Sequence, residues 1–451
     1  MRLFLHVAQG REQDHVADAG AVGQQHHQAV DADAAAAGRR HARRRAGGAA
    51  GGAGFGDAGQ RTARRERNLD RGGRQQRRQG TRLMADKTAA AIRRASRQAQ
   101  MAMKRLDDEA VAELQRIYGD AAGEVEAAIR AAAAGGNRVE LARLRELLQQ
   151  VEAVLRALGE RRDQLLTGAL DQAAELGVRP LTGAGIAATG RMAQAPLEVS
   201  RAVEIADAAV AFVREFRAAD GLVLSDRLWA IDRGAREALG RAIEQAVVQG
   251  ASADQAAAAL VMRGQEVPQA TRAAQQASEL PQVLRAAELL RDETAAPLAS
   301  ALRVLRTEIN RAHGEAYMAG AEAAQGVVGF RFLLSPNHPR PDICDLLARQ
   351  NLHGLGAGVY PTRQDTPWPA HPNTLSFVVA VFADEVTAAD RAGKETTLEA
   401  LGRLAPELRA GVLGPTKAGY FDQGLLSKNA VRSTVGAVRA RLTRQGRLQA
   451  A

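Results

Sequence analysis

Residues 335–381 read SPNHPRPDICDLLARQNLHGLGAGVYPTRQDTPWPAHPNTLSFVVAV, and this stretch decides the fold of the C-terminal part of the chain. It is dense in Pro, Gly and His, which is typical of a long ordered loop. The segments at its two ends, 327–336 (VVGFRFLLSP) and 375–384 (LSFVVAVFAD), are rich in β-branched and aromatic residues and are predicted to be buried strands. Because helical patterns flank both strands, we expect a small α+β domain over residues 301–430, followed by a basic helical tail at residues 431–451.

The chain before this domain has the pattern of long helices. Over residues 137–158, Leu and Val recur at i, i+3, i+4 and i+7 with charged residues on the other face, and Gly159 is the predicted stop. Residues 84–176 are predicted to form a helical region and residues 191–300 a helical bundle, joined by a Gly- and Pro-rich linker at 177–190. The predicted fold class is therefore mainly α: an elongated helical N-terminal region followed by the small α+β domain.

Residues 1–83 differ in composition from the rest. They carry 16 arginines, no lysine and 8 acidic residues, and they hold five of the nine histidines. The segment has almost no periodic Leu, Ile or Val, so it cannot bury enough apolar surface to offset chain entropy and is predicted to be disordered. The first helical pattern follows Met84. One hypothesis is therefore a mis-annotated start with translation beginning at Met84, and the alternative is a basic arm that binds nucleic acid.

Composition also excludes several classes of protein. Residues 84–451 carry 45 basic and 43 acidic residues, and this near-neutral body argues against strong DNA binding. The single cysteine, Cys344, excludes a disulfide framework and a zinc site made of cysteines alone. No apolar run is long enough to predict a membrane span. GLGAG at 354–358 is followed by Val359-Tyr360-Pro361, which cannot begin a helix, so it is predicted to be a turn and no nucleotide cofactor is expected.

Four side chains in the loop have the chemistry of metal ligands. They are His338, Asp342, Cys344 and His371, which a compact turn would bring together. The spacing lacks the paired ligands of most zinc sites, so we expect no bound metal. In the preferred interpretation both histidines cap strand ends by bonding backbone or Asp342, and Asp342 is the N-cap of the short helix ICDLLARQ. A Cys/His/Asp nucleophile has less support, because no glycine elbow lies beside Cys344.

Several motifs occur together, in the order and spacing of a known family. They are Arg306-Thr307-Glu308-x-Asn310, LSPNHPRPDICD (334–345), GLGAGVYP (354–361), PAHPN (369–373) and LRAGVLGPTKAGYFDQGLLS (408–427). Together they resemble the head-morphogenesis family of phage minor head proteins, whose namesake is the F protein of phage Mu. The resemblance implies a structural loop built on Arg306, Glu308, Asn310, His338, Asp342, Cys344, Gly356, Tyr360, His371, Pro372 and Asn373.

Two details accompany this resemblance. The family commonly has a Cys-x-Cys-like pair directly after HPN, where this chain has Thr374 and Ser376, so any role of those cysteines is absent here. Arg306 and Asn310 lie one helical turn apart on a shared face, where they would either hold the Pro-rich loop in place through charge-assisted bonds or form a solvated face.

The resemblance implies a structural protein that is not an enzyme. It would be present in few copies in the virion, inside the head near the portal, and in the host bacterial cytoplasm during assembly. Its expected partners are the portal protein and capsid or scaffold proteins, with weak contact to packaged DNA, no membrane and no small-molecule substrate. The alternatives are a metal-dependent hydrolase that uses the His338–His371 loop, and a prophage effector-delivery protein. The latter is disfavoured because too few residues follow residue 430 for an effector domain.

Overall fold

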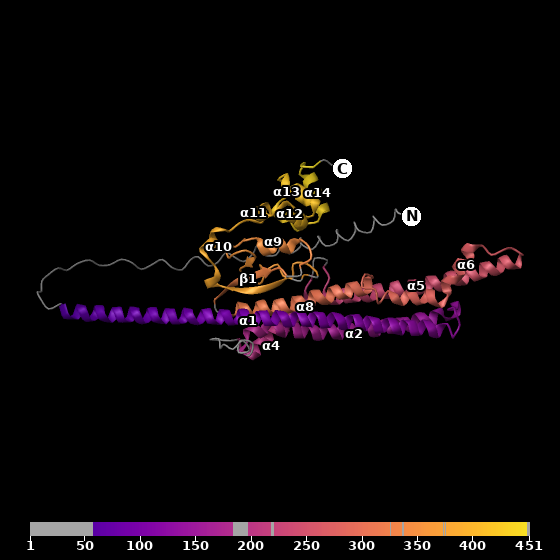
Figure 1. Cartoon of the computed structure of the whole chain (residues 1–451), viewed down its shortest axis with the longest axis horizontal. Coiled ribbons are helices and arrows are strands. Elements are labelled where there is room, and N and C mark those ends of the chain that lie inside the picture. Colours follow the sequence, from indigo (N-terminus) through magenta and orange to yellow (C-terminus); the bar gives the residue numbers. More distant parts are fainter. Residues whose placement is uncertain are drawn as a thin grey trace, which may run out of the picture.

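The structure is a computed structural model that describes residues 57–183, 197–217, 221–324, 326–335, 338–372, 374 and 376–448, with side chains from residue 89 onward. The described chain is mainly helical, with a small three-stranded antiparallel sheet in its C-terminal region. Long helices form an elongated bundle, and the sheet and a group of short helices lie on one side of this bundle (Figure 1). The predicted fold class is confirmed.

The bundle is built around α2. It comprises α1 (Asp57–Ala132), α2 (Leu144–Val178), α4 (Val199–Glu215), α5 (Leu224–Met262), α6 (Gln269–Gln275), α7 (Leu280–Glu288) and α8 (Ala296–Glu322). α2 packs against α1, α4, α5 and α8. Its buried positions include Leu147, Val151, Leu155 and Leu158, which confirms the predicted apolar stripe and shows that it faces neighbouring helices of the same chain.

Gly159 does not end this helix, contrary to the prediction, because α2 continues to Val178. A Cβ at Gly159 would lie 3.4 Å from the carboxylate of Asp232 on α5. The same carboxylate forms an ion pair with Arg162, whose side chain is only 3% exposed. The glycine therefore gives α5 room to approach α2 beside the ion pair between buried Arg162 and the more exposed Asp232.

The N-terminal boundary of the helical region also differs from the prediction. α1 begins at Asp57, so residues 57–83 are helical, which corrects the prediction that all of residues 1–83 are disordered. Nine of the 27 residues in this stretch are Arg and four are Gln, and the intrinsic helix propensity of these residues does not require an apolar stripe. Residues 1–56 and 184–196, which include the second half of the predicted linker, lie outside the described residues, and the start at Met84 stays a hypothesis.

The sheet has the order β2-β1-β3, and both pairings are antiparallel. Its strands are β1 (Val327–Leu333), β2 (Val359–Tyr360) and β3 (Phe377–Phe382). The two strands predicted from the sequence are therefore confirmed, and they pair with each other. In β1, Phe330 and Phe332 are completely buried in a core shared with α8 and with residues 89–92 of α1. This core joins the sheet to the bundle.

Short helices complete the C-terminal region. They are α9 (Ile343–Arg349), α10 (Ala388–Ala392), α11 (Thr397–Arg403), α12 (Pro406–Leu413), α13 (Pro415–Asp422) and α14 (Val435–Arg444). Leu401 and Leu413 share a buried cluster with Val431, Val438 and Leu442. The predicted tail is thus helical as expected, but its apolar side chains belong to the folded C-terminal unit. None of the described helices combines the length and the apolar character that a membrane span needs.

Candidate functional site

The candidate site begins at the N-terminus of α9, where Asp342 caps the helix. Its Oδ1 accepts a hydrogen bond of 2.7 Å from the backbone N–H of Cys344, and Asp345 Oδ2 accepts one of 3.0 Å from the backbone N–H of Asp342. This reciprocal arrangement is a capping box. The predicted N-cap role of Asp342 is confirmed, and it holds the carboxylate and the thiol of Cys344 on the same turn.

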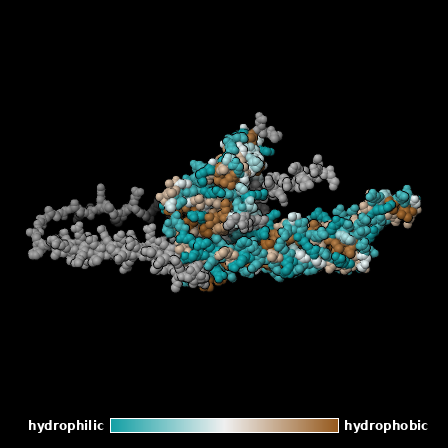
Figure 2. All heavy atoms as spheres, viewed as in Figure 1, coloured by the Kyte–Doolittle hydropathy of each residue, from teal (hydrophilic) through white to brown (hydrophobic). Residues whose placement is uncertain are grey.

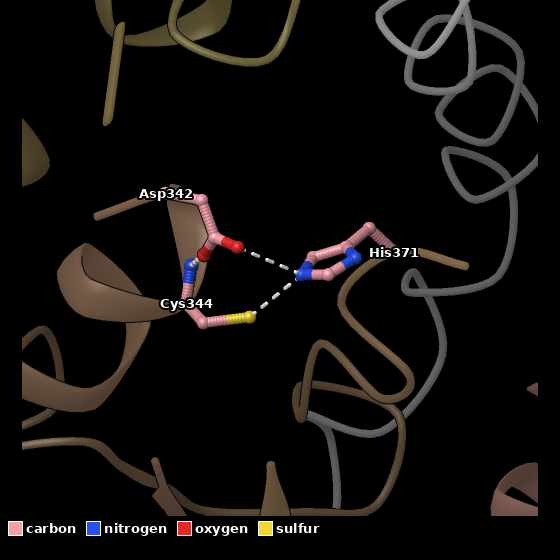
Figure 3. Close-up of side chains that lie close together, drawn as sticks. All are labelled: Asp342, Cys344 and His371. Atoms are coloured by element: carbon pink, nitrogen blue, oxygen red, sulfur yellow. Dashed lines mark hydrogen bonds and ion pairs between the residues drawn. The ribbon is translucent and has the colours of Figure 1, made fainter. Parts of the chain in front are cut away.

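The Pro-rich loop brings His371 to this turn. Its Nε2 lies 3.1 Å from Cys344 Sγ and 3.2 Å from Asp342 Oδ2 (Figure 3). Its Nδ1 lies 2.7 Å from the carbonyl oxygen of Pro372. Because a carbonyl only accepts, Nδ1 carries a hydrogen, and the ring is oriented with Nε2 toward both the thiol and the carboxylate.

The electrostatics of the cluster favour a charged imidazole. Burial disfavours the charge on His371, but hydrogen bonds to Asp342 and Cys344 outweigh burial and raise its pKa to about 10. Burial also raises the pKa of Asp342, yet bonds from His371 and from the backbone of Cys344 leave that pKa below its ordinary value. Without another cation, the pair is an imidazolium and a carboxylate at neutral pH.

This geometry differs from that of a Cys/His/Asp catalytic set. In such sets the acid orients the imidazole through the ring nitrogen opposite the nucleophile. Here Asp342 and Cys344 face the same nitrogen of His371, and the other nitrogen bonds a backbone carbonyl. The thiol is also completely buried. The arrangement is better suited to holding a proton or a metal ion than to nucleophilic attack.

His338 lies beside this cluster but does not join it. Its Nε2 is 2.9 Å from Asp345 Oδ2 and 3.8 Å from Asp342 Oδ1. The four residues singled out as ligand types therefore form two groups that share Asp342, one with Cys344 and His371 and one with His338 and Asp345. Sequence reasoning missed Asp345, although its position three residues after the N-cap is the capping-box pattern that would have identified it.

The helix motif of the resemblance reaches the loop through Asn310. Its Nδ2 donates a bond of 2.8 Å to the carbonyl of Thr374, as the first alternative predicts, and its own carbonyl lies 3.4 Å from the Trp368 indole nitrogen. Arg306 does not reach the loop: its guanidinium lies 3.8 Å from Asp107 of α1 and its side chain is 43% exposed, which agrees with the solvated alternative. Glu308 is turned away from the loop and is buried between two arginines of the bundle.

The other motif residues have roles in the loop backbone. Gly356 has a φ of 110°, which favours glycine, and its N–H donates to Asn351 Oδ1 at 3.1 Å. The Tyr360 hydroxyl donates to the Leu347 carbonyl at 2.9 Å, joining β2 to α9. Pro372 is exposed and offers its carbonyl to the imidazole, while Asn373 lies outside the described residues.

Thr374 is a residue that sequence reasoning did not assign to the site. It is 4% exposed, and its Oγ1 lies 3.7 Å from Cys344 Sγ. The available signal was its position, directly after HPN, where the family resembled here commonly has cysteine.

No family model, no curated protein and no solved structure matches this chain.

Proposed function

We propose that the protein is a minor head protein of a tailed phage or prophage that acts in head assembly near the portal. One observation carries the proposal: motifs that lie far apart in the sequence contact one another around the loop. Asn310 of α8 bonds Thr374, which is 64 positions away. Arg432, five residues after the last motif, donates to the Ala370 carbonyl of PAHPN at 3.0 Å. A set of motifs that packs together is what a shared structural module requires.

The form of the bundle also supports a role in assembly. It is elongated and exposes apolar surface at the tip beside α6 (Figure 2). At the end of α5, Val261 and Met262 are 63% and 88% exposed. An exposed apolar tip on a long helical arm is suited to protein partners. Because residues 84–451 are nearly neutral, we place portal and capsid or scaffold proteins before packaged DNA as partners.

The test is co-purification with the portal protein encoded beside this chain. The full-length chain and that portal protein would be expressed together and purified through a tag on one of them. We expect a complex that survives nuclease treatment and moderate salt, since protein surfaces and not bridging DNA would hold it. An unrelated portal protein is the control. Absence of the complex, or its loss after nuclease treatment, would contradict the proposal.

A metal-dependent hydrolase is the second candidate function, and the cluster of Asp342, Cys344 and His371 is the observation that favours it. Three protein ligands with an open fourth position are the usual arrangement of catalytic zinc sites. This candidate requires hydrolysis that depends on metal and is lost in His371→Ala. The effector-delivery alternative gains no support from the described residues, because α14 packs within the C-terminal cluster.

A further inference from the structure

We propose that Asp342, Cys344 and His371 bind one divalent transition-metal ion, with zinc as the best fit, and that this ion fastens the Pro-rich loop to the start of α9. The three residues each point one ligand atom toward the same space, and those atoms lie within 4.8 Å of one another. The inference does not depend on the proposed function, since a minor head protein and a hydrolase could both hold such an ion.

The orientation of the imidazole is the first argument. Because His371 Nδ1 donates to the Pro372 carbonyl, its Nε2 is the nitrogen available to a metal. A backbone carbonyl on the opposite ring nitrogen is the usual way in which proteins orient a histidine that ligates zinc. At neutral pH this nitrogen carries a proton that faces a carboxylate oxygen at 3.2 Å and a sulfur at 3.1 Å, and a metal ion would displace that proton to solvent and bind the same three atoms.

Distances provide the second argument. With ordinary zinc bond lengths, tetrahedral coordination places sulfur and nitrogen about 3.5 Å apart, and nitrogen and oxygen about 3.4 Å apart. The distances in the structure, 3.1 and 3.2 Å, are shorter by a few tenths of an ångström. The side chains of Asp342 and His371 are 33% and 25% exposed and have room to move outward, whereas Cys344 is completely buried.

The donor set is the third argument. A thiolate and an imidazole favour zinc over magnesium or calcium, which prefer oxygen ligands. Asp342 Oδ1 is already bonded to the N–H of Cys344, so Oδ2 is left as the single carboxylate ligand. Water or Thr374, whose Oγ1 is 3.7 Å from the Cys344 sulfur, would occupy the fourth coordination position of the metal. His338 bonds Asp345 at 2.9 Å and lies outside this ligand set.

The test uses cobalt as a spectroscopic substitute for zinc in the full-length chain. Cobalt bound by a thiolate gives a charge-transfer absorption, and Cys344 is the only cysteine of the chain, so this band reports on one site. Histidines in the N-terminal segment produce no such band even if they bind cobalt. We expect the band to saturate at one equivalent, and zinc to displace it and to raise the melting temperature of the protein.

Three variants determine whether the proposed residues are the ligands. We expect His371→Ala and Asp342→Asn to bind cobalt at least tenfold more weakly. Asn is as good an N-cap as Asp, so Asp342→Asn keeps α9 intact if the alanine variant misfolds. His353→Ala is the control, because His353 is an exposed histidine of the same loop and should leave the band unchanged. Absence of a band in the wild-type protein, or an unchanged affinity in Asp342→Asn, would overturn the proposal.

Discussion

Glu308 allows a quantitative test of the bundle, because replacing it with alanine should remove a buried ion-pair network. Its carboxylate is 1% exposed and accepts bonds of 2.9 Å from Arg227 of α5 and 2.8 Å from Arg311 of its own helix. The Arg311 guanidinium also lies 3.8 Å from the ring centroid of Phe216, at the end of α4. Glu308 therefore joins α5 and α8 directly, and Arg311 extends the network to the end of α4.

The expected cost follows from what the substitution leaves behind. At about 4 Å and an effective dielectric constant of about 20, each ion pair contributes about 4 kcal/mol of attraction, which offsets the desolvation of both charges. In Glu308→Ala, Arg311, whose side chain is 7% exposed in the wild type, loses its bonded carboxylate and keeps only a Coulombic interaction with Glu315. Arg227 is 16% exposed and keeps a bond of 3.2 Å to the Leu222 carbonyl, so its loss is smaller. We expect the free energy of unfolding to fall by about 3–5 kcal/mol, as it does when other buried ion pairs lose one partner.

The matched control is Glu113→Ala. Glu113 and Arg116 have the same i, i+3 spacing on a helix and a separation of 2.5 Å, but the two side chains are 41% and 60% exposed. Solvent screens such a pair, so this variant should change stability little. The free energy of unfolding would be measured by urea denaturation followed by circular dichroism, with unchanged m-values. If Glu308→Ala cost less than about 1 kcal/mol, or no more than Glu113→Ala, the reasoning about buried charge would be refuted.

Three further predictions concern the junction of α8, the loop and the cluster. Burial lowers the pKa of His313 to about 4, so the folded state excludes a proton that the unfolded chain accepts. The contribution of neutral His313 to folding stability is therefore complete above about pH 6.5 and is lost as the pH falls toward 4. Wild type should lose about 2 kcal/mol more than His313→Gln between pH 7.5 and pH 5, and equal losses in denaturation experiments would contradict this. Gly314→Ala would place a Cβ against the Trp368 indole and should lower the free energy of unfolding by about 1–3 kcal/mol. The control is Gly240→Ala, in open space on α5, which should be neutral or stabilising. Equal melting temperatures of the two variants would refute this. Thr374→Cys adds a second thiolate near Cys344, so under reducing conditions it should tighten cobalt binding and strengthen the charge-transfer band. An unchanged cobalt titration would argue that position 374 lies outside the coordination shell.

Local sequence patterns determined much of the secondary structure. The stripe from Leu147 to Leu158 and the apolar segments that became β1 and β3 each fold as their periodicity and composition predict. The N-cap role of Asp342 was also readable, since capping depends on residues only a few positions apart. These features rest on interactions within one turn or one strand.

The limits of helices were less predictable, because they depend on neighbours. Gly159 has the local character of a helix stop, yet α2 continues because α5 packs against that position and Asp232 pairs with Arg162. Composition similarly predicted disorder up to residue 83, although α1 begins at Asp57. Burial of an apolar face and intrinsic helix propensity contribute separately to the stability of a helix. The absence of an apolar stripe removes only the contribution from burial.

The composition of the candidate site was decided by tertiary structure. The sequence by itself named four ligand-type residues, and spacing could not tell which of the two histidines would meet Cys344. Only the folded loop, held by the bond from Asn310 to Thr374, brings His371 to the thiol, while His338 turns to Asp345. Short-range order is therefore set by local propensity, whereas the meeting of residues 27 positions apart depends on the packing of the whole domain.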